Sequence, residues 1–176
     1  GAPQARALRL PGAISPRGPP ASDGSGRTVA VIIDGDDGRT ASTHSDNVER
    51  GISALTRHYG IAQDDMIVLS PEYKRATRET VSQTALSVAG ALGPEDRLVI
   101  YTTGHGNRGG GQTWLRLEGR DYILDSEFMS AYFANNAGRI VYIGDQCYSG
   151  GFVEQAQVMA MSAESRKQVI ALSSTD

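Results

Sequence analysis

The sequence predicts an α/β fold in which helices cover both faces of a mainly parallel sheet. Two observations lead to this prediction. The apolar segments are short and nearly uninterrupted, which is typical of strands buried on both faces, and they alternate with segments of helical period. A strand–helix–strand order gives right-handed crossovers and parallel strands, so the helices form two outer layers. A length of 176 residues, 39% of them hydrophobic, fits one globular domain.

The chain begins with a segment that we expect to be a flexible arm. Residues 1–26 contain five of the seven prolines and end in a run of Ser, Asp and Gly, and they show no helical or strand period. The folded domain is therefore expected over 27–176. Its first strand is the uninterrupted apolar run 28–34.

Two amphipathic helices alternate with the next two strands. The first helix is expected to begin at Ser45 or Asp46 and to end at Gly60, and its inner face consists of Val48, Ile52, Leu55 and Tyr59. The second runs from Thr77 to about Leu92, where a Gly-Pro pair ends it, with Val81, Ala85, Val88 and Leu92 inward. The strands that follow these helices are 66–69 and 97–103.

The second half of the chain continues the alternation around a hairpin. After a glycine-rich stretch we expect a hairpin of 113–117 with 122–124, a helix capped by Asp125 or Ser126 that buries Phe128, Met129, Tyr132 and Phe133, and strands at 139–144 and 168–172. In parallel sheets, ligands bind outside the carboxyl ends of the strands. The residues directly after each strand are therefore the candidates for function.

Two side chains suited to nucleophilic chemistry follow neighbouring strands. His105, flanked by glycines, comes directly after 97–103, and Cys147 comes after 139–144. Both should emerge at one edge of the sheet, as catalysis by a thiol and an imidazole requires. The glycines allow sharp turns that present N–H groups to a substrate carbonyl, and a helix that begins after Ser149 would favour the thiolate.

Each of these residues also has a simpler interpretation. A lone cysteine is most often a small buried hydrophobe, but Cys147 has polar neighbours and follows its strand. The G-x-G-x-x-G pattern at 104–109 would bind a dinucleotide only if a helix followed, whereas 110–117 alternates like a strand. The aspartates of 34–38 lack the rest of a calcium loop and are typical of a polar turn. We therefore expect no metal and no cofactor.

The segments TTGHG (102–106) and DQCYSG (145–150) resemble the His-Gly and Cys blocks of the caspase-like cysteine peptidases, which include caspases, metacaspases, gingipains and legumains. The layout of the chain is most similar to the legumain-like family. The resemblance implies a caspase-like three-layer sandwich that acts as a cysteine endopeptidase. It implies that Cys147 is the nucleophile, that His105 donates a proton to the leaving amine, and that the N–H groups of Gly106 and Cys147 form the oxyanion hole.

The resemblance also assigns the pocket for the substrate side chain before the cleaved bond. By position, its lining residues are Asp46, Thr103, Asp145, Ser173 and Ser174. Two carboxylates favour a basic guest, as in metacaspases, so we rank Arg or Lys first, Asn second and Asp third. The arginine that precedes a histidine in legumains is a threonine here, and Asp46 has an alternative role as a helix cap.

The same resemblance bears on partners. Related domains carry one more strand and further helices after the fifth strand, so either a small carboxyl-terminal fragment of the same precursor completes the fold, or the remainder lies outside this chain. A net charge of −3 predicts no nucleic-acid-binding face, and the apolar runs are too short for a membrane segment. A lone thiol favours the cytoplasm. The alternative function is a catalytically inactive caspase-like scaffold that binds a partner protein.

Overall fold

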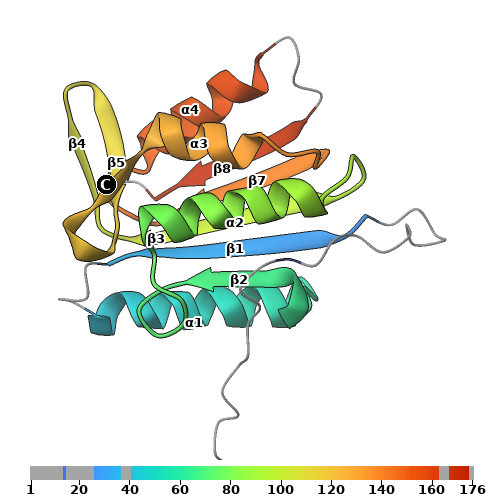
Figure 1. The fold of residues 1–176 in the computed structure, drawn as a ribbon, viewed down its shortest axis with the longest axis horizontal. Coiled ribbons are helices and arrows are strands. Elements are labelled where there is room, and N and C mark those ends of the chain that lie inside the picture. Colours follow the sequence, from blue (N-terminus) through green and yellow to red (C-terminus); the bar gives the residue numbers. More distant parts are fainter. Residues whose placement is uncertain (1–13, 15–25, 37–40, 163–166, 175–176) are drawn as a thin grey trace, which may run out of the picture.

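The computed structural model describes residue 14 and residues 26–36, 41–162 and 167–174. Within these residues, five parallel strands form one sheet in the order β2-β1-β3-β7-β8 (Figure 1). The prediction of a mainly parallel sheet is therefore confirmed. The strands are β1 (Thr28–Gly35), β2 (Met66–Leu69), β3 (Arg97–Gly104), β7 (Arg139–Gly144) and β8 (Gln168–Ser173).

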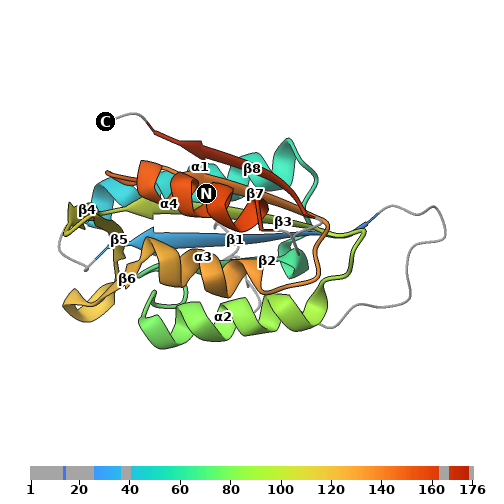
Figure 2. The same ribbon diagram turned by 90° about the horizontal axis from the view of Figure 1, so that it is seen from above.

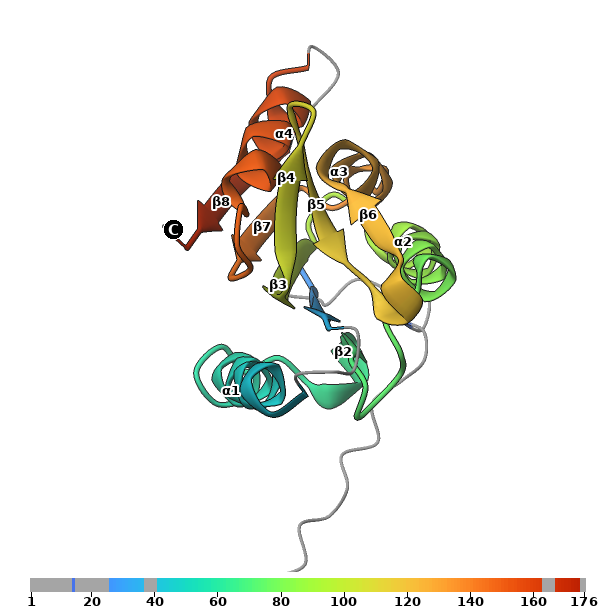
Figure 3. The ribbon, with the colours of Figure 1, turned by 90° about the vertical axis from the view of Figure 1, so that its left-hand side faces the viewer.

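Helices cover both faces of this sheet. Figure 3, a view along the strands, shows α1 on one side and α2, α3 and α4 on the other. Successive side chains of β1 point to opposite faces: Val29, Val31 and Ile33 pack under the group of three helices, whereas Ala30 and Ile32 pack under α1. The bounds are α1 (Ala41–Arg57), α2 (Arg78–Ala91), α3 (Asp125–Phe133) and α4 (Gly150–Ala160), with single 3-10 turns η1 (Gln63–Asp65) and η2 (Glu118–Arg120).

The second helix, α2, forms as the sequence predicts. Thr77 is its N-cap: the Thr80 N–H donates to the Thr77 hydroxyl at 3.1 Å, and the Thr77 N–H donates to the Thr80 hydroxyl at 2.9 Å. These bonds satisfy donors that the first turn of a helix leaves without intrahelical partners. The apolar residues at helical spacing are buried, and each buried aliphatic side chain stabilises the fold by about 1.5–3 kcal/mol.

The first helix differs from its prediction at both ends. It begins at Ala41, several residues before the expected cap at Ser45 or Asp46, and it ends at Arg57. The added first turn is polar and therefore carries no apolar period to detect. Tyr59 was expected on the inner face, but it lies beyond the last helical residue and is 75% exposed. Gly60, with φ of 66°, is the residue at which the chain turns away.

A second, smaller sheet grows out of the main one after β3. Its order is β4-β5-β6, and both pairings are antiparallel. The expected hairpin is confirmed as β5 (Gln112–Arg116) with β6 (Tyr122–Leu124), but the glycine-rich stretch was wrongly left without structure, because it forms β4 (Gly106–Gly109). Glycine has a low strand propensity, so no residue pattern marked it. Gly110 and Gly111 both have positive φ, as a two-residue hairpin turn requires.

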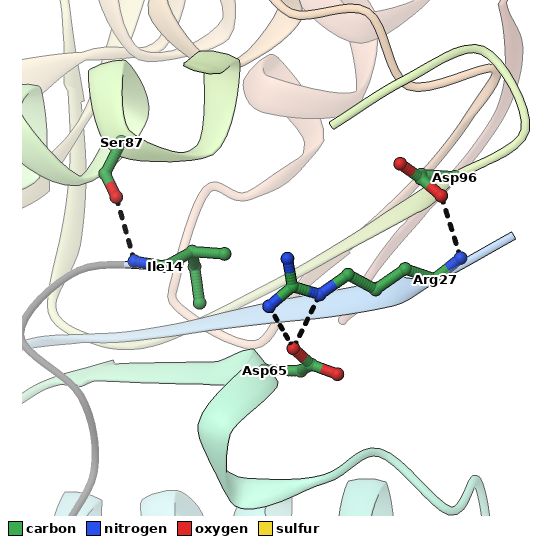
Figure 4. Close-up of polar contacts among 5 residues, drawn as sticks. All are labelled: Ile14, Arg27, Asp65, Ser87 and Asp96. Carbon is green, nitrogen blue, oxygen red and sulfur yellow. Dashed lines mark hydrogen bonds and ion pairs between the residues drawn. The ribbon is translucent and has the colours of Figure 1, made fainter. Parts of the chain in front are cut away.

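One residue of the expected arm packs into the domain. Ile14 is buried in the core, and its N–H donates to the Ser87 hydroxyl at 2.9 Å (Figure 4). Arg27, just before β1, donates through its N–H to Asp96 and through its side chain to Asp65. The remainder of the arm, residues 1–13 and 15–25, lies outside the described residues.

On the face that α1 covers, the half formed by β7 and β8 has no helix over it in the described part of the chain. α1 packs against the β2, β1 and β3 side, and β8 pairs only with β7, so that β8 forms an edge (Figure 2). Ile170 and Leu172 on β8 are more than half exposed. A groove of about 460 Å³ runs between them and Leu55 and Tyr59. The expectation of a small fragment that completes the fold stays a prediction.

No helix in the described residues has both the length and the apolarity that a membrane span needs. This finding agrees with the short apolar runs of the sequence.

Candidate active site

The loop that carries His105 is fixed by its backbone. The His105 N–H donates to the Gly35 carbonyl at 2.9 Å, and the His105 carbonyl accepts from the Arg116 N–H at 2.9 Å. Gly104, the last residue of β3, has φ of 101°, and a Cβ there would lie 2.7 Å from an Asp34 carboxylate oxygen. Glycine is therefore required where the chain leaves the sheet. The result is a partly exposed imidazole at the carboxyl end of β3.

The turn that carries Cys147 is anchored by its buried neighbour Gln146. The Gln146 side-chain carbonyl accepts from the Thr102 hydroxyl at 2.7 Å, and its amide donates to the Tyr142 hydroxyl at 3.1 Å. The backbone N–H of Asp145 donates to the Thr102 carbonyl at 2.7 Å, which continues the ladder between β3 and β7 by one residue. Beyond this anchor Cys147 is exposed. The interpretation of this cysteine as a buried core residue is therefore wrong.

The backbone is strained at the residue directly after the cysteine. Tyr148 has φ of 60°, in the left-handed region that a residue other than glycine rarely adopts. Such a conformation persists only where the surrounding structure holds it, and it is common at functional sites. After Ser149 the chain enters α4, so the expected strand-to-helix turn with Cys147 just before the helix is present.

The two turns touch at Gly106. A Cβ added to Gly106 would lie only 1.8 Å from the Cys147 carbonyl oxygen, so the two backbones are in direct contact. Gly106 faces Leu115 in the β4–β5 pair, next to the hydrogen-bonded pair of His105 with Arg116. Hydrogen-bonded and non-bonded pairs alternate along an antiparallel ladder, so the Gly106 N–H points away from β5.

A second histidine, His44 of α1, contacts His105. Their ring centroids are 4.8 Å apart, with the planes at 79° in an edge-to-face arrangement. Burial lowers the pKa of His44, and the neighbouring His105 lowers it further, while Asp36 and Asp145 raise it. Its Nδ1 is buried and has no partner among the described residues. His44 lies before the expected start of this helix, so its contact with His105 was not expected.

Two buried carboxyl groups, Asp34 and Asp36, lie beneath the site. Asp34 ends the expected strand 28–34 and belongs to β1. The segment 34–38 was expected to form an exposed polar turn, but Asp34 and Asp36 are both 1% exposed; residues 37 and 38 lie outside the described part. Burial, followed by the charges of Asp36 and Glu72, raises the pKa of Asp34 to about 7. A carboxyl group shifted in this way retains its proton over much of the acidic range.

The structure brings only some of the expected pocket residues together. Thr103 and Asp145 lie at the carboxyl ends of β3 and β7, and Ser173 pairs with Gly144 at the end of β8. The Ser174 N–H donates to the Gly144 carbonyl at 2.8 Å, which brings both serines to the same edge. Asp46 is exposed on α1.

The residue of α1 that reaches Thr103 is the neighbour of Asp46. The Asn47 amide donates to the Thr103 hydroxyl at 3.1 Å. The hydroxyl of Tyr101, which shares a strand face with Thr103, donates to an Asp145 carboxylate oxygen at 2.9 Å. Sequence reasoning missed both. The two-residue spacing of Tyr101 and Thr103 would have found the tyrosine. Asn47 lies within the expected helix as well, but its contact across to Thr103 depends on how the helix packs on the sheet, which no spacing shows.

No group of three or more His, Cys, Asp or Glu side chains in the described part of the chain is arranged to bind a metal ion. No model of a protein family matches this chain, and no curated protein matches it either. The residues of the site itself are therefore the basis for a functional assignment.

Proposed function

We propose that this chain is a caspase-like cysteine endopeptidase with Cys147 as its nucleophile and His105 as its acid–base residue. The observation that carries the proposal is the contact of the two turns at Gly106, where the Cys147 carbonyl oxygen occupies the space of a side chain. This contact puts an exposed thiol and a partly exposed imidazole on adjoining turns at one edge of a parallel sheet. The His105 loop is held by its backbone bonds, and the Cys147 turn is held by the backbone of Asp145 and the buried side chain of Gln146, which favours a fixed geometry.

In the proposed reaction His105 accepts the thiol proton, and the Cys147 sulfur attacks the carbonyl carbon of the peptide bond. The carbonyl oxygen takes a negative charge, which the N–H groups of Gly106 and Cys147 stabilise. The C–N bond then breaks as His105 donates its proton to the departing amine. Water hydrolyses the remaining thioester, which releases the carboxylic acid and restores the thiol.

For the residue before the cleaved bond we propose Arg or Lys first, Asn second and Asp third. The exposed carboxylate of Asp145 lies two residues before the nucleophile, and Thr103 lies on the neighbouring strand. A carboxylate near the reacting thiol attracts a guanidinium or an ammonium group and repels an aspartate. Asp46, Ser173 and Ser174 remain proposed lining residues of this pocket.

Peptide cleavage by single-site variants tests the assignment. Cys147→Ala and His105→Ala are expected to abolish the cleavage of a peptide with Arg before the cleaved bond, while circular dichroism shows that both variants still fold. His58→Ala is the matched control, because His58 is exposed beyond the end of α1, and it should cleave at the wild-type rate. Unchanged turnover in either active-site variant refutes the proposal. A folded wild-type protein without cleavage of any peptide supports the inactive scaffold instead.

A further inference from the structure

We propose that Tyr101 is a positioning residue that orients the Asp145 carboxylate toward a basic side chain of the substrate. The proposal rests on the proposed function for the place of the substrate beside Cys147. It adds a residue that touches neither the nucleophile nor the substrate and that determines specificity through Asp145. Its basis is a row of polar side chains (Asn47, Thr103, Tyr101 and Asp145) that runs from α1, across β3, to the turn after β7.

The row has four members and two hydrogen bonds. The Asn47 amide donates to the Thr103 hydroxyl at 3.1 Å, and the Tyr101 hydroxyl donates to an Asp145 carboxylate oxygen at 2.9 Å. The Thr103 and Tyr101 side chains lie on the same face of β3 and join the two halves. Thr103 is completely buried, so the middle of the row is anchored in the protein interior. Asp145, at one end, is exposed.

The chemistry of the two end groups fixes the direction of both bonds. An ionised carboxylate only accepts hydrogen bonds, so the Tyr101 hydroxyl must donate to Asp145. The amide nitrogen of Asn47 only donates, so the Thr103 oxygen accepts from it. A hydrogen bond to a charged acceptor is stronger than one between neutral groups. The bond from Tyr101 therefore favours one orientation of the Asp145 carboxylate.

Tyr101 itself has little freedom to move. Its ring lies so close to α1 that a Cβ added to Gly51 would be 3.1 Å from two ring carbons. Burial, the hydrogen bond to Asp145 and the negative charge of that residue all raise the pKa of Tyr101, so the phenol keeps its proton. Without this donor, the exposed Asp145 side chain would rotate in solvent. A substrate would then have to order it on binding, which weakens binding.

The test compares probes that differ only in charge. Peptidyl acyloxymethyl ketones with Arg or with the neutral isostere citrulline in the last position label Cys147, and mass spectrometry gives the rate constant for each. Tyr101→Phe should slow labelling by the Arg probe about tenfold, the effect of losing a hydrogen bond to a charged group, and leave the citrulline probe within about twofold. Tyr59→Phe, at an exposed tyrosine beyond α1, is the matched control.

Two outcomes overturn the proposal. If Tyr101→Phe slows both probes equally, the tyrosine has only a structural role. If neither rate changes, Tyr101 does not act on Asp145. Thr103→Val, which leaves the donor to Asp145 in place, should lower the ratio of the Arg rate to the citrulline rate less than Tyr101→Phe does. A larger effect of the valine variant would assign the preference for a charged side chain to Thr103 and not to Tyr101.

A binding measurement separates this proposal from the proposed function. In the Cys147→Ala background no reaction occurs, and calorimetry gives the affinity of a peptide amide that ends in Arg. Adding Tyr101→Phe should weaken this affinity about tenfold. If wild-type protein reacts with no probe but Tyr101→Phe weakens binding, the peptidase proposal fails and the role of Tyr101 stands. Equal affinities of the two Cys147→Ala proteins refute the role of Tyr101 whatever the wild-type protein does.

Discussion

Gly106 is the residue at which the turn of His105 meets the turn of Cys147. Its missing side chain leaves room for the Cys147 carbonyl, which lies 1.8 Å from where a Cβ would be. Real Cβ atoms do not tolerate such a contact with backbone, so any side chain at this position must push the two turns apart. A displacement of about 1 Å at reacting groups is enough to reduce catalysis about a hundredfold.

We therefore expect Gly106→Ala to reduce peptide cleavage about a hundredfold or more, with a much smaller effect on the free energy of unfolding. Gly90→Ala is the matched control, because a Cβ at Gly90 in α2 would meet nothing within 4 Å. The control should keep full activity and gain about 0.4–1 kcal/mol in stability. Urea unfolding and cleavage rates measure both effects. Full activity of Gly106→Ala would show that the contact does not matter for catalysis.

Asp34 gives the stability of the domain a specific dependence on pH. Its pKa rises from 3.8 to about 7 in the folded protein, so between these values the folded state binds more protons than the unfolded state. The contribution of Asp34 to the free energy of unfolding is present at low pH and is lost as pH rises through the pKa that Asp34 has in the folded state. Asp34→Asn should therefore be more stable than wild type at pH 8, and this advantage should shrink toward pH 4. Urea midpoints at five pH values measure the difference, and a constant difference would contradict the shift.

At the scale of elements, α2 is held by its cap as well as by its buried face. Thr77→Ala removes the hydroxyl that accepts from the Thr80 N–H, and we expect a loss of about 1 kcal/mol in unfolding free energy. Thr77→Ser keeps the acceptor and should retain most of the stability. Neither change should affect labelling of Cys147, because the Thr77 side chain bonds within its own helix cap, to Thr80. Equal stability of the alanine and serine variants would show that the cap contributes nothing.

The elements show how far sequence patterns reach. The strands of the main sheet and α2 follow from uninterrupted apolar runs and from regular spacing, since burial on a sheet face determines both. The start of α1 and the strand β4 could not be predicted from such patterns, because polar residues and glycines carry no apolar period there. The same limit applies to the site. Cys147 and His105 follow from their places after strands. His44 belongs to the polar first turn of α1, which the pattern did not reveal, and Asn47 is one of the polar residues of that helix whose contacts no apolar period marks.

For the whole molecule, the two faces of the sheet differ in how much they contribute to stability. Ile100, on the face under three helices, is completely buried, whereas Ile170 on the edge strand is 57% exposed. We expect Ile100→Ala to reduce the free energy of unfolding by about 2–5 kcal/mol and Ile170→Ala by less than about 1 kcal/mol. Thermal or urea unfolding of the two variants measures the contrast. Similar losses would indicate that the groove beside β8 is covered in solution.

The central claim is that Cys147 and His105 act together at one edge of the sheet, and the rate at which the thiol reacts tests it most directly. Labelling by the Arg acyloxymethyl ketone, followed by intact mass, should add one label per wild-type chain and none to Cys147→Ala. His105→Ala should react about a hundredfold more slowly, as expected for the loss of an acid–base group, while His58→Ala should match wild type. Equal labelling rates for His105→Ala and wild type would contradict the account, because the imidazole would then take no part in the chemistry of the thiol.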